Sequence, residues 1–425
     1  MLKIKNKIPS ALTIGGKIVE RIKMRNEVVW EKVQLDYFYI ESLGDGNTIS
    51  VVNKGNGNTD KVTPTLEYST DKNTWNTITF DWTNGTHTTE LPVKLNTGGK
   101  MYFRNDTRLF SNSSSKYISF LSSVASNVGG DIRTLRNYID VNNETTVQSY
   151  MFYRLFNSNK YIVDASNLRL SYTTLEERCY GYMFNGCTSL VNAPELPATT
   201  LASQCYDSMF YGCTSLTSAP ALPATTLKDY CYQSMFQNCT SLVNAPSLPA
   251  TTLEGSCYIS MFDGCTSLTT APSLPATTLV NQCYGYMFQN CTSLVNAPEL
   301  PANTLAYYCY QYMFFNCTSL VNPPSLPATN LVESCYYGMF DNCTSLVNAP
   351  ELPAKSLVTK CYYNMFYGCT SLNSITVYAD DISATDCTTD WLYNVASTGT
   401  FNNYGSATYT DSTSGIPLGW TIVNS

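Results

Sequence analysis

Histidine, charged residues and long apolar runs are scarce in this chain, and each scarcity excludes a class of function. The 425 residues include one histidine, His87, which argues against histidine-based metal sites, catalytic triads and proton relays. Only 13% of the residues are charged, about half of the usual quarter. The net charge of −7 and the pI near 4.9 argue against nucleic-acid binding. This composition favours a structural or adhesive protein over an enzyme.

No apolar stretch approaches the ~18 residues that a membrane-spanning helix needs, so no membrane insertion is expected. The N-terminus has the positive charge of a signal peptide, but Lys17, Glu20 and Arg21 interrupt its apolar part. We therefore expect synthesis in a cytosol without export by the general secretory route.

The dominant feature is a repeat of 26 residues that two series of cysteines mark. The first series is Cys179, Cys205, Cys231, Cys257, Cys283, Cys309, Cys335, Cys361 and Cys387. The second series, eight residues later, is Cys187, Cys213, Cys239, Cys265, Cys291, Cys317, Cys343 and Cys369. A constant period of this size predicts a solenoid, in which each unit packs only on its neighbours. We predict a solenoid over 150–396, with an irregular first unit 150–178, eight regular units 179–386, a degenerate cap from 387, and a C-terminal cap segment 397–425.

Each unit reads C-Y-x-x-M-F-x-[GN]-C-T-S-L-x-x-A-P-x-L-P-A-T-T-L-x-x-x. Cys205, Met209 and Cys213 are four residues apart, which predicts one face of a short helix. Gly212 would end that helix in the left-handed conformation. The stretch from Leu216 to Leu222 predicts an extended rung, kept short by proline. The fold class expected is therefore an α/β solenoid with equivalent residues ~5 Å apart, behind a mainly β N-terminal part.

The unit is similar to the cysteine-bearing, bacterial-surface (BspA-like) leucine-rich repeat. Met-Phe, Cys-Thr-Ser-Leu and Leu-Pro occupy the slots of that family's pattern throughout residues 150–396. The resemblance implies a curved solenoid of short strands backed by short helices or turns. The family occurs in adhesins of bacteria and protists and in phage structural proteins, so the resemblance implies an adhesive or structural role. It implies no enzymatic activity and no cofactor.

The segment 1–33 predicts a small β module of three strands. Gly15-Gly16 and Arg25-Asn26 supply turn signals between them. Three such strands bury little apolar surface, so the module is expected to dock on something larger. The pattern resembles N-terminal modules of phage tail and fibre proteins, which implies an anchoring role.

Residues 34–130 predict a β-sandwich, and 131–149 a bridge to the first unit. The strands expected are Tyr37–Ile40, Thr48–Val52, Leu66–Ser69, Trp75–Ile78 and Lys100–Arg104. The Leu66–Ser69 and Lys100–Arg104 segments together with Trp75 resemble an immunoglobulin-like domain.

The paired cysteines allow three interpretations. A spacing of eight without histidines matches no zinc site, so no metal is expected. Disulfides between neighbouring rungs are geometrically conceivable, but each cysteine would have two equivalent partners. Cytosolic synthesis keeps thiols reduced, which favours two ladders of buried free thiols.

Other polar groups receive a structural interpretation first. His87 is expected to be solvated or hydrogen-bonded. Glu195, Glu299 and Glu351 recur at one repeat position and could form a glycosidase pair, but solvated surface positions are favoured. Asn-Cys-Thr sequons would accept glycans only in a secreted eukaryotic chain. These sequons begin at Asn238, Asn290, Asn316 and Asn342.

Comparison between the copies gives the candidate binding face. The positions that vary gather before the first cysteine and two, three and six residues after it, and many hold aromatic residues. The candidates are Tyr182, Tyr211, Tyr230, Tyr286, Tyr307, Tyr308, Tyr312, Phe315, Tyr337, Tyr363 and Tyr367. Such a face is typical of contact surfaces for protein or glycan, and stacking between rungs is the alternative. For the near-invariant tyrosine after each first cysteine, such as Tyr180, we expect stacking.

These observations predict a non-enzymatic phage virion structural protein, a tail or head fibre, synthesised in the host cytoplasm. Its expected partners are other virion proteins at the N-terminal region, and a host surface protein or glycan at the repeats. Fibres commonly trimerise, so a homotrimer is an expected state, although no coiled-coil heptads are visible. The alternative is a cell-surface adhesin of a bacterium. A glycan-degrading enzyme is the third and least favoured class.

Overall fold

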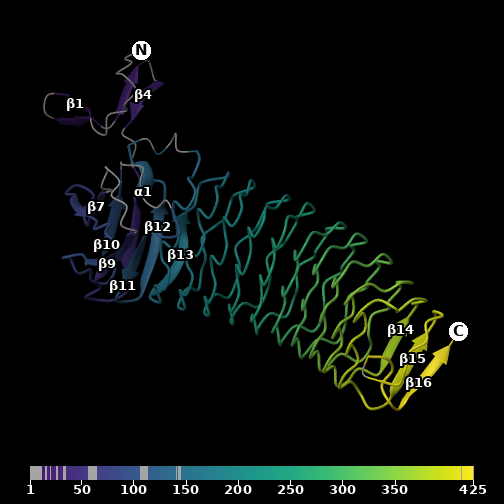
Figure 1. The fold of residues 1–425 in the computed structure, drawn as a ribbon. Coiled ribbons are helices and arrows are strands. Elements are labelled where there is room, and N and C mark those ends of the chain that lie inside the picture. The colour runs from purple at the N-terminus through teal and green to yellow at the C-terminus, as the bar shows by residue number, and fades with distance from the viewer. Residues whose placement is uncertain are drawn as a thin grey trace.

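The protein is mainly β with almost no helix. The computed structural model describes residues 35–55, 65–105, 113–139, 141, 145–412 and 414–424, and the backbone of strands between 12 and 31. Among the described residues, α1 (Thr134–Asn137) is the only α-helix. Figure 1 shows a β-rich body followed by an elongated stack of similar coils that leads to the C-terminus.

Four short strands near the N-terminus form two antiparallel hairpins. β1 (Leu12–Ile14) pairs with β2 (Lys17–Val19), and β3 (Arg21–Met24) pairs with β4 (Glu27–Glu31). The prediction of three strands is wrong, because the segment expected as one strand is divided between β2 and β3. Both predicted turns lie outside the described residues.

Two sheets follow, built from strands that mostly alternate buried and less buried residues. The larger has the order β13-β12-β5-β10-β7-β8 and the smaller the order β11-β6-β9. These strands are β5 (Phe38–Ser42), β6 (Ile49–Gly55), β7 (Thr65–Ser69), β8 (Asn76–Thr79), β9 (Gly85–Glu90), β10 (Lys100–Arg104), β11 (Tyr117–Ser122), β12 (Ser126–Asp131) and β13 (Ile162–Arg169). All five strands predicted here are present, whereas β9, β11 and β12 were not predicted.

The body and the repeats share one core. β13 lies in the first repeat and pairs in parallel with β12 of the body. The amide of Phe120 donates to the carbonyl of Leu155 at 2.7 Å. The ring of Phe120 lies 6.2 Å from that of Phe156, which stacks on Phe184 at 5.0 Å. Aromatic packing therefore runs without a break from the sheets into the stack.

One side of each coil is a chain of tight turns, so the prediction of a short helix is wrong. Successive amides alternate between the carbonyl three residues back and a carbonyl of the next repeat. The amide of Cys187 donates to Phe184 (3.0 Å), whereas that of Phe184 donates to Met209 (2.9 Å). Donors committed to the next repeat cannot make the i→i−4 bonds of a helix. Left-handed residues recur every four positions, including the predicted Gly212 (φ 69°). We call this the turn side.

The opposite side of each coil is extended. Its contacts with the next coil are isolated parallel bridges, such as Ser218 with Asn244 and Asn244 with Thr270. The leucines that flank this stretch, Leu216 and Leu222, are buried. Parallel strand pairing occurs at the two ends of the stack. β13 pairs with β12 at the first repeat. At the C-terminal end β14 (Ser374–Val377), β15 (Gly399–Asn403) and β16 (Trp420–Asn424) form a three-stranded sheet.

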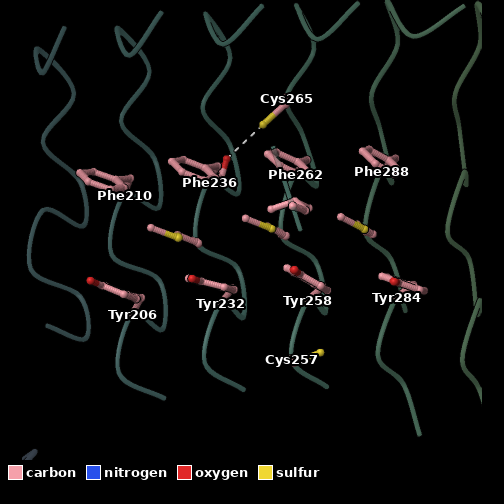
Figure 2. Packing of buried hydrophobic residues seen from close by; sticks show 14 of the residues in the cluster. Tyr206, Phe210, Tyr232, Phe236, Cys257, Tyr258, Phe262, Cys265, Tyr284 and Phe288 are labelled. Carbon is pink, nitrogen blue, oxygen red and sulfur yellow. Dashed lines mark hydrogen bonds between the residues drawn. The ribbon is translucent and has the colours of Figure 1, made fainter. Parts of the chain in front are cut away.

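Two ladders of buried rings fill the coils, as Figure 2 shows for four repeats. The tyrosines after each first cysteine stack from Tyr180 to Tyr362 with centroids 5.6–6.0 Å apart, which confirms the stacking prediction. The phenylalanines from Phe184 to Phe366 stack at 5.6–5.7 Å. Both spacings exceed the ~4.8 Å between paired strands. The stacked rings are therefore more widely spaced than the paired strands of a sheet.

Candidate contact surface

The predicted face lies on the turn side of the repeats. Five of its tyrosines adopt left-handed backbone conformations with φ between 49° and 57°. They are Tyr182, Tyr230, Tyr286, Tyr308 and Tyr312. A side chain raises the energy of this conformation by about 1–2 kcal/mol relative to glycine. Other repeats place serine, glutamine or glycine at the equivalent positions. The backbone therefore gives no reason for tyrosine, and the reason must lie in what the rings contact.

Seven of the predicted residues form one contiguous network of rings over four repeats. Tyr312 lies at its centre, 5.6 Å from Tyr286 and 5.3 Å from Tyr337. Tyr337 stacks on Tyr363 with centroids 4.7 Å apart and planes 8° from parallel. We call this network the tyrosine cluster. Its members are Tyr286, Tyr307, Tyr308, Tyr312, Phe315, Tyr337 and Tyr363.

The edge of the tyrosine cluster is open to solvent. Tyr307 is 39% exposed and meets Tyr308 edge-on at 4.0 Å. The other members are half-buried. Rings that hold one another in place lose little conformational freedom when a partner binds, which is why aromatic residues are efficient contact residues.

The remaining four candidates lie outside this network. Tyr182 packs on Tyr153 at 5.6 Å, and Tyr367 stacks on Tyr393 at 4.8 Å. The hydroxyl of Tyr211 accepts a hydrogen bond of 3.2 Å from the amide of Asn238. Tyr230 is 40% exposed. Tyr153 and Tyr393 are not among the predicted residues, although Tyr393 stands one period after Tyr367 and the period alone identifies it.

Several groups in and near the tyrosine cluster have raised pKa values, and burial is the main cause for Tyr286, Tyr312 and Tyr337. Burial raises the pKa of Asp341 to about 7. Hydrogen bonding to Tyr308 is the main cause that raises the pKa of Tyr307 to about 12. The phenol of Tyr307 is therefore protonated at neutral pH, so its ring keeps the negative face of a neutral aromatic group.

The family described as BspA type leucine rich repeat region matches residues 145–295 and 285–386 in six copies, which is more than half of the chain. The chain belongs to this family. Comparisons with curated proteins and with solved structures found no match. The immunoglobulin-like resemblance of the sandwich stays a prediction. The BspA-type family is not known for an enzymatic activity.

The repeat cysteines of this BspA-type chain are structural thiols. All seventeen are free and buried. In the second series the thiol donates to a carbonyl of the previous repeat, as Cys265 does to Phe236 at 3.1 Å (Figure 2). Burial raises the pKa of thiols in both series, to about 12 for Cys231. Thiols so far from ionisation are poor nucleophiles and metal ligands. No group of three or more potential metal ligands occurs among the described residues.

The other polar candidates occupy structural positions. His87 lies on β9 with Nδ1 3.6 Å from Oδ2 of Asp81. Glu195, Glu299 and Glu351 are exposed. The sequon asparagines have left-handed backbones, and their side-chain amides donate hydrogen bonds. Their acceptors are Tyr211, Asp263, Asn290 and Asp341. In the described part of the chain, no helix has the length and apolar character that crossing a membrane requires.

Proposed function

We propose that this chain is a non-enzymatic phage virion structural protein, a tail or head fibre. Its N-terminal region, beginning with residues 1–33, attaches it to other virion proteins. The stacked repeats form the solenoid predicted from the 26-residue period and touch the host surface. The tyrosine cluster is the observation that carries this proposal. It places seven rings on the outside of a stack whose interior is filled with ring ladders, in a chain of a family not known for catalysis.

A second candidate function is that of a bacterial cell-surface adhesin, which membership of the BspA-type family favours. Both functions use the repeats as a rigid contact surface, and they differ in where the chain resides. Electron microscopy of virions with a gold label on the C-terminus tests the first. Label on the bacterial envelope, with none on particles, supports the second.

The contact role is tested by Tyr308→Ala combined with Tyr337→Ala. We expect weaker adsorption to cells of a susceptible host, because both residues belong to the tyrosine cluster, with a melting temperature nearly unchanged. Tyr404→Ala is the control, since Tyr404 is 41% exposed and lies outside the cluster. Unchanged adsorption of the double variant would assign host contact to the N-terminal region or leave the repeats a purely architectural role.

A further inference from the structure

The charge of the chain is distributed unevenly around the tyrosine cluster. Between Lys228 and Lys355 the sequence contains no lysine, arginine or histidine. The same segment, 229–354, contains seven acidic residues. They are Asp229, Glu254, Asp263, Glu299, Glu333, Asp341 and Glu351. Outside this segment the chain has 25 acidic and 25 basic residues, so the whole net charge of −7 resides in it. Six of the seven residues of the tyrosine cluster lie in this segment.

Elsewhere in the protein, the chain's own cations cover its aromatic rings. Arg104 lies 3.9 Å above the ring of Trp75, and Lys100 lies 4.1 Å above that of Tyr39. Within the repeats, Arg154 lies 5.0 Å from Tyr182. None of the cation–π contacts among the described residues involves the tyrosine cluster. The cluster therefore has rings of the kind that bind cations, without an internal cation to occupy them.

One exposed carboxylate, that of Glu333, and one buried acidic group, that of Asp341, lie near these uncovered rings. Glu333 is exposed and occupies the same turn position as Tyr307, one repeat further along. The backbone carbonyl of Asp341 accepts a hydrogen bond of 2.8 Å from Asn316, which places it in the coil next to Tyr312. A guanidinium group can lie flat on a tyrosine ring and donate to a carboxylate at the same time. An anionic partner, by contrast, would meet the like charge of Glu333 beside Tyr307. The basic residue Lys360 lies at the other end of the cluster, where its carbonyl accepts a hydrogen bond from the amide of Tyr363.

We infer that the tyrosine cluster binds a basic segment of a partner protein, with arginine or lysine side chains lying on its exposed rings. This inference rests on the proposed contact function and names the chemistry of the partner. Charge complementarity selects a protein segment with cationic side chains, since a neutral glycan would gain nothing from the excess of acidic residues in segment 229–354. Exposed Tyr307 and half-buried Tyr308 receive the cations, and exposed Glu333 lies close enough to Tyr307 to affect its pKa.

The test measures binding of a fluorescein-labelled octa-arginine peptide to the full chain by fluorescence anisotropy at 0.15 M salt. We expect Tyr307→Ala combined with Tyr308→Ala to weaken binding about tenfold, because two cation–π contacts are removed. Tyr307→Phe combined with Tyr308→Phe keeps both rings and should retain most of the affinity. Glu333→Gln should weaken binding, whereas Tyr404→Ala, on an exposed ring outside the cluster, should not.

Several results would overturn the inference. Equal affinity of the wild type and the alanine variant would mean that the peptide responds to bulk negative charge alone. Binding of a chitosan oligomer without binding of the peptide would identify an amino sugar as the ligand. If the alanine variant loses adsorption to host cells although the wild type ignores the peptide, the contact function stands and the basic partner is wrong. The phenylalanine and glutamine variants keep the test decisive if the alanine variant folds poorly.

Discussion

At the scale of single residues, the turn side contains strained backbone, because many of its non-glycine residues adopt left-handed conformations. Each repeat holds up to three left-handed residues, one before the first cysteine and others three and seven residues after it. Only the last of these positions is regularly glycine or asparagine, the residues that tolerate this conformation best. The other two positions carry serine or tyrosine most often, and also glutamine, arginine, lysine or aspartate, so the stack contains many sites where strain can be relieved.

Ser260→Gly is therefore expected to stabilise the protein by about 1 kcal/mol, since Ser260 has φ 55° and glycine adopts this conformation without strain. Ser267 lies in the same repeat without a positive φ, and Ser267→Gly is the matched control, expected to destabilise. Thermal unfolding followed by circular dichroism compares the two variants. A lower melting temperature for Ser260→Gly would contradict the strain argument.

A buried carboxylate gives the repeats a pH dependence. Burial raises the pKa of Asp207 to about 6, although a hydrogen bond from Ser208 and the charge of Arg178 offset part of the shift. Because the folded-state pKa exceeds the unfolded value, the contribution of this group to stability is fully present below about pH 4. It is lost as the pH rises through 6.

Asp207→Asn should therefore raise the melting temperature at pH 7.5 and leave it almost unchanged at pH 4. About two pKa units correspond to on the order of 2–3 kcal/mol at the higher pH. Asparagine keeps the size of the side chain and an acceptor for Ser208. Asp229→Asn, at an exposed position near the end of the same repeat, is the control and should shift neither value. Melting temperatures of the wild type and both variants between pH 4 and pH 7.5 test this prediction, and an equal shift of Asp207→Asn at both pH values would contradict it.

At the scale of elements, the period was predictable from the sequence but the local conformation was not. Cys205, Met209 and Cys213 share one side in a helix of 3.6 residues per turn, and they also share one side in a chain of turns that repeats every four residues. Over nine residues the two periods give the same pattern of buried side chains. The helix and the chain of turns differ in the carbonyl that accepts from every second amide. In the chain of turns this carbonyl lies 25 residues away, and it leaves no local signal in the sequence.

The residues of the candidate surface were predictable from the repeats, but the contacts between them were not. Variation between copies identified all members of the tyrosine cluster, because buried columns such as Tyr180 and its equivalents scarcely change. Variation could not tell which aromatic residues touch. Tyr182 satisfies the same pattern as Tyr312, yet it packs on Arg154 and Tyr153. The absence of an internal cation at the tyrosine cluster is visible only when ring contacts and charges are considered together.

The same hydrogen-bond register predicts which deletions the stack tolerates. Removal of residues 257–282, one whole repeat, joins Ser256 to Cys283 and restores every inter-repeat bond in the same register. We expect a folded, monodisperse protein with a slightly lower melting temperature. Removal of residues 257–269, half a repeat, would place extended stretches against turns, and we expect it to aggregate. Size-exclusion chromatography and circular dichroism distinguish the outcomes, and equal tolerance of both deletions would contradict the stacking register.

At the scale of the whole molecule, the sheets form the first layer of the stack rather than a flexible spacer. A solenoid needs a cover for the apolar face of its first coil. Here β13 of the first repeat is a strand of the larger sheet, and the side-chain amide of Asn159 donates to the carbonyl of Phe120 at 3.1 Å. Phe38 and Phe120 continue the phenylalanine ladder into the sheets. A rod made in this way transmits the orientation of its base to the tyrosine cluster.

Continuity of the core predicts that damage in the first repeat reaches the sheets. Phe156 is fully buried and contacts the rings of Phe38, Phe120 and Phe184, so Phe156→Ala should cost about 3–5 kcal/mol. Hydrogen exchange should then quicken in β5 and β11 as well as in the first repeats. Phe366→Ala removes an equally buried ring of the same ladder far along the stack, and each repeat packs only on its neighbours, so β5 and β11 should keep their protection. Unaltered exchange in β5 and β11 of Phe156→Ala would mean that the sheets and the repeats unfold independently. That result would contradict the shared packing between them.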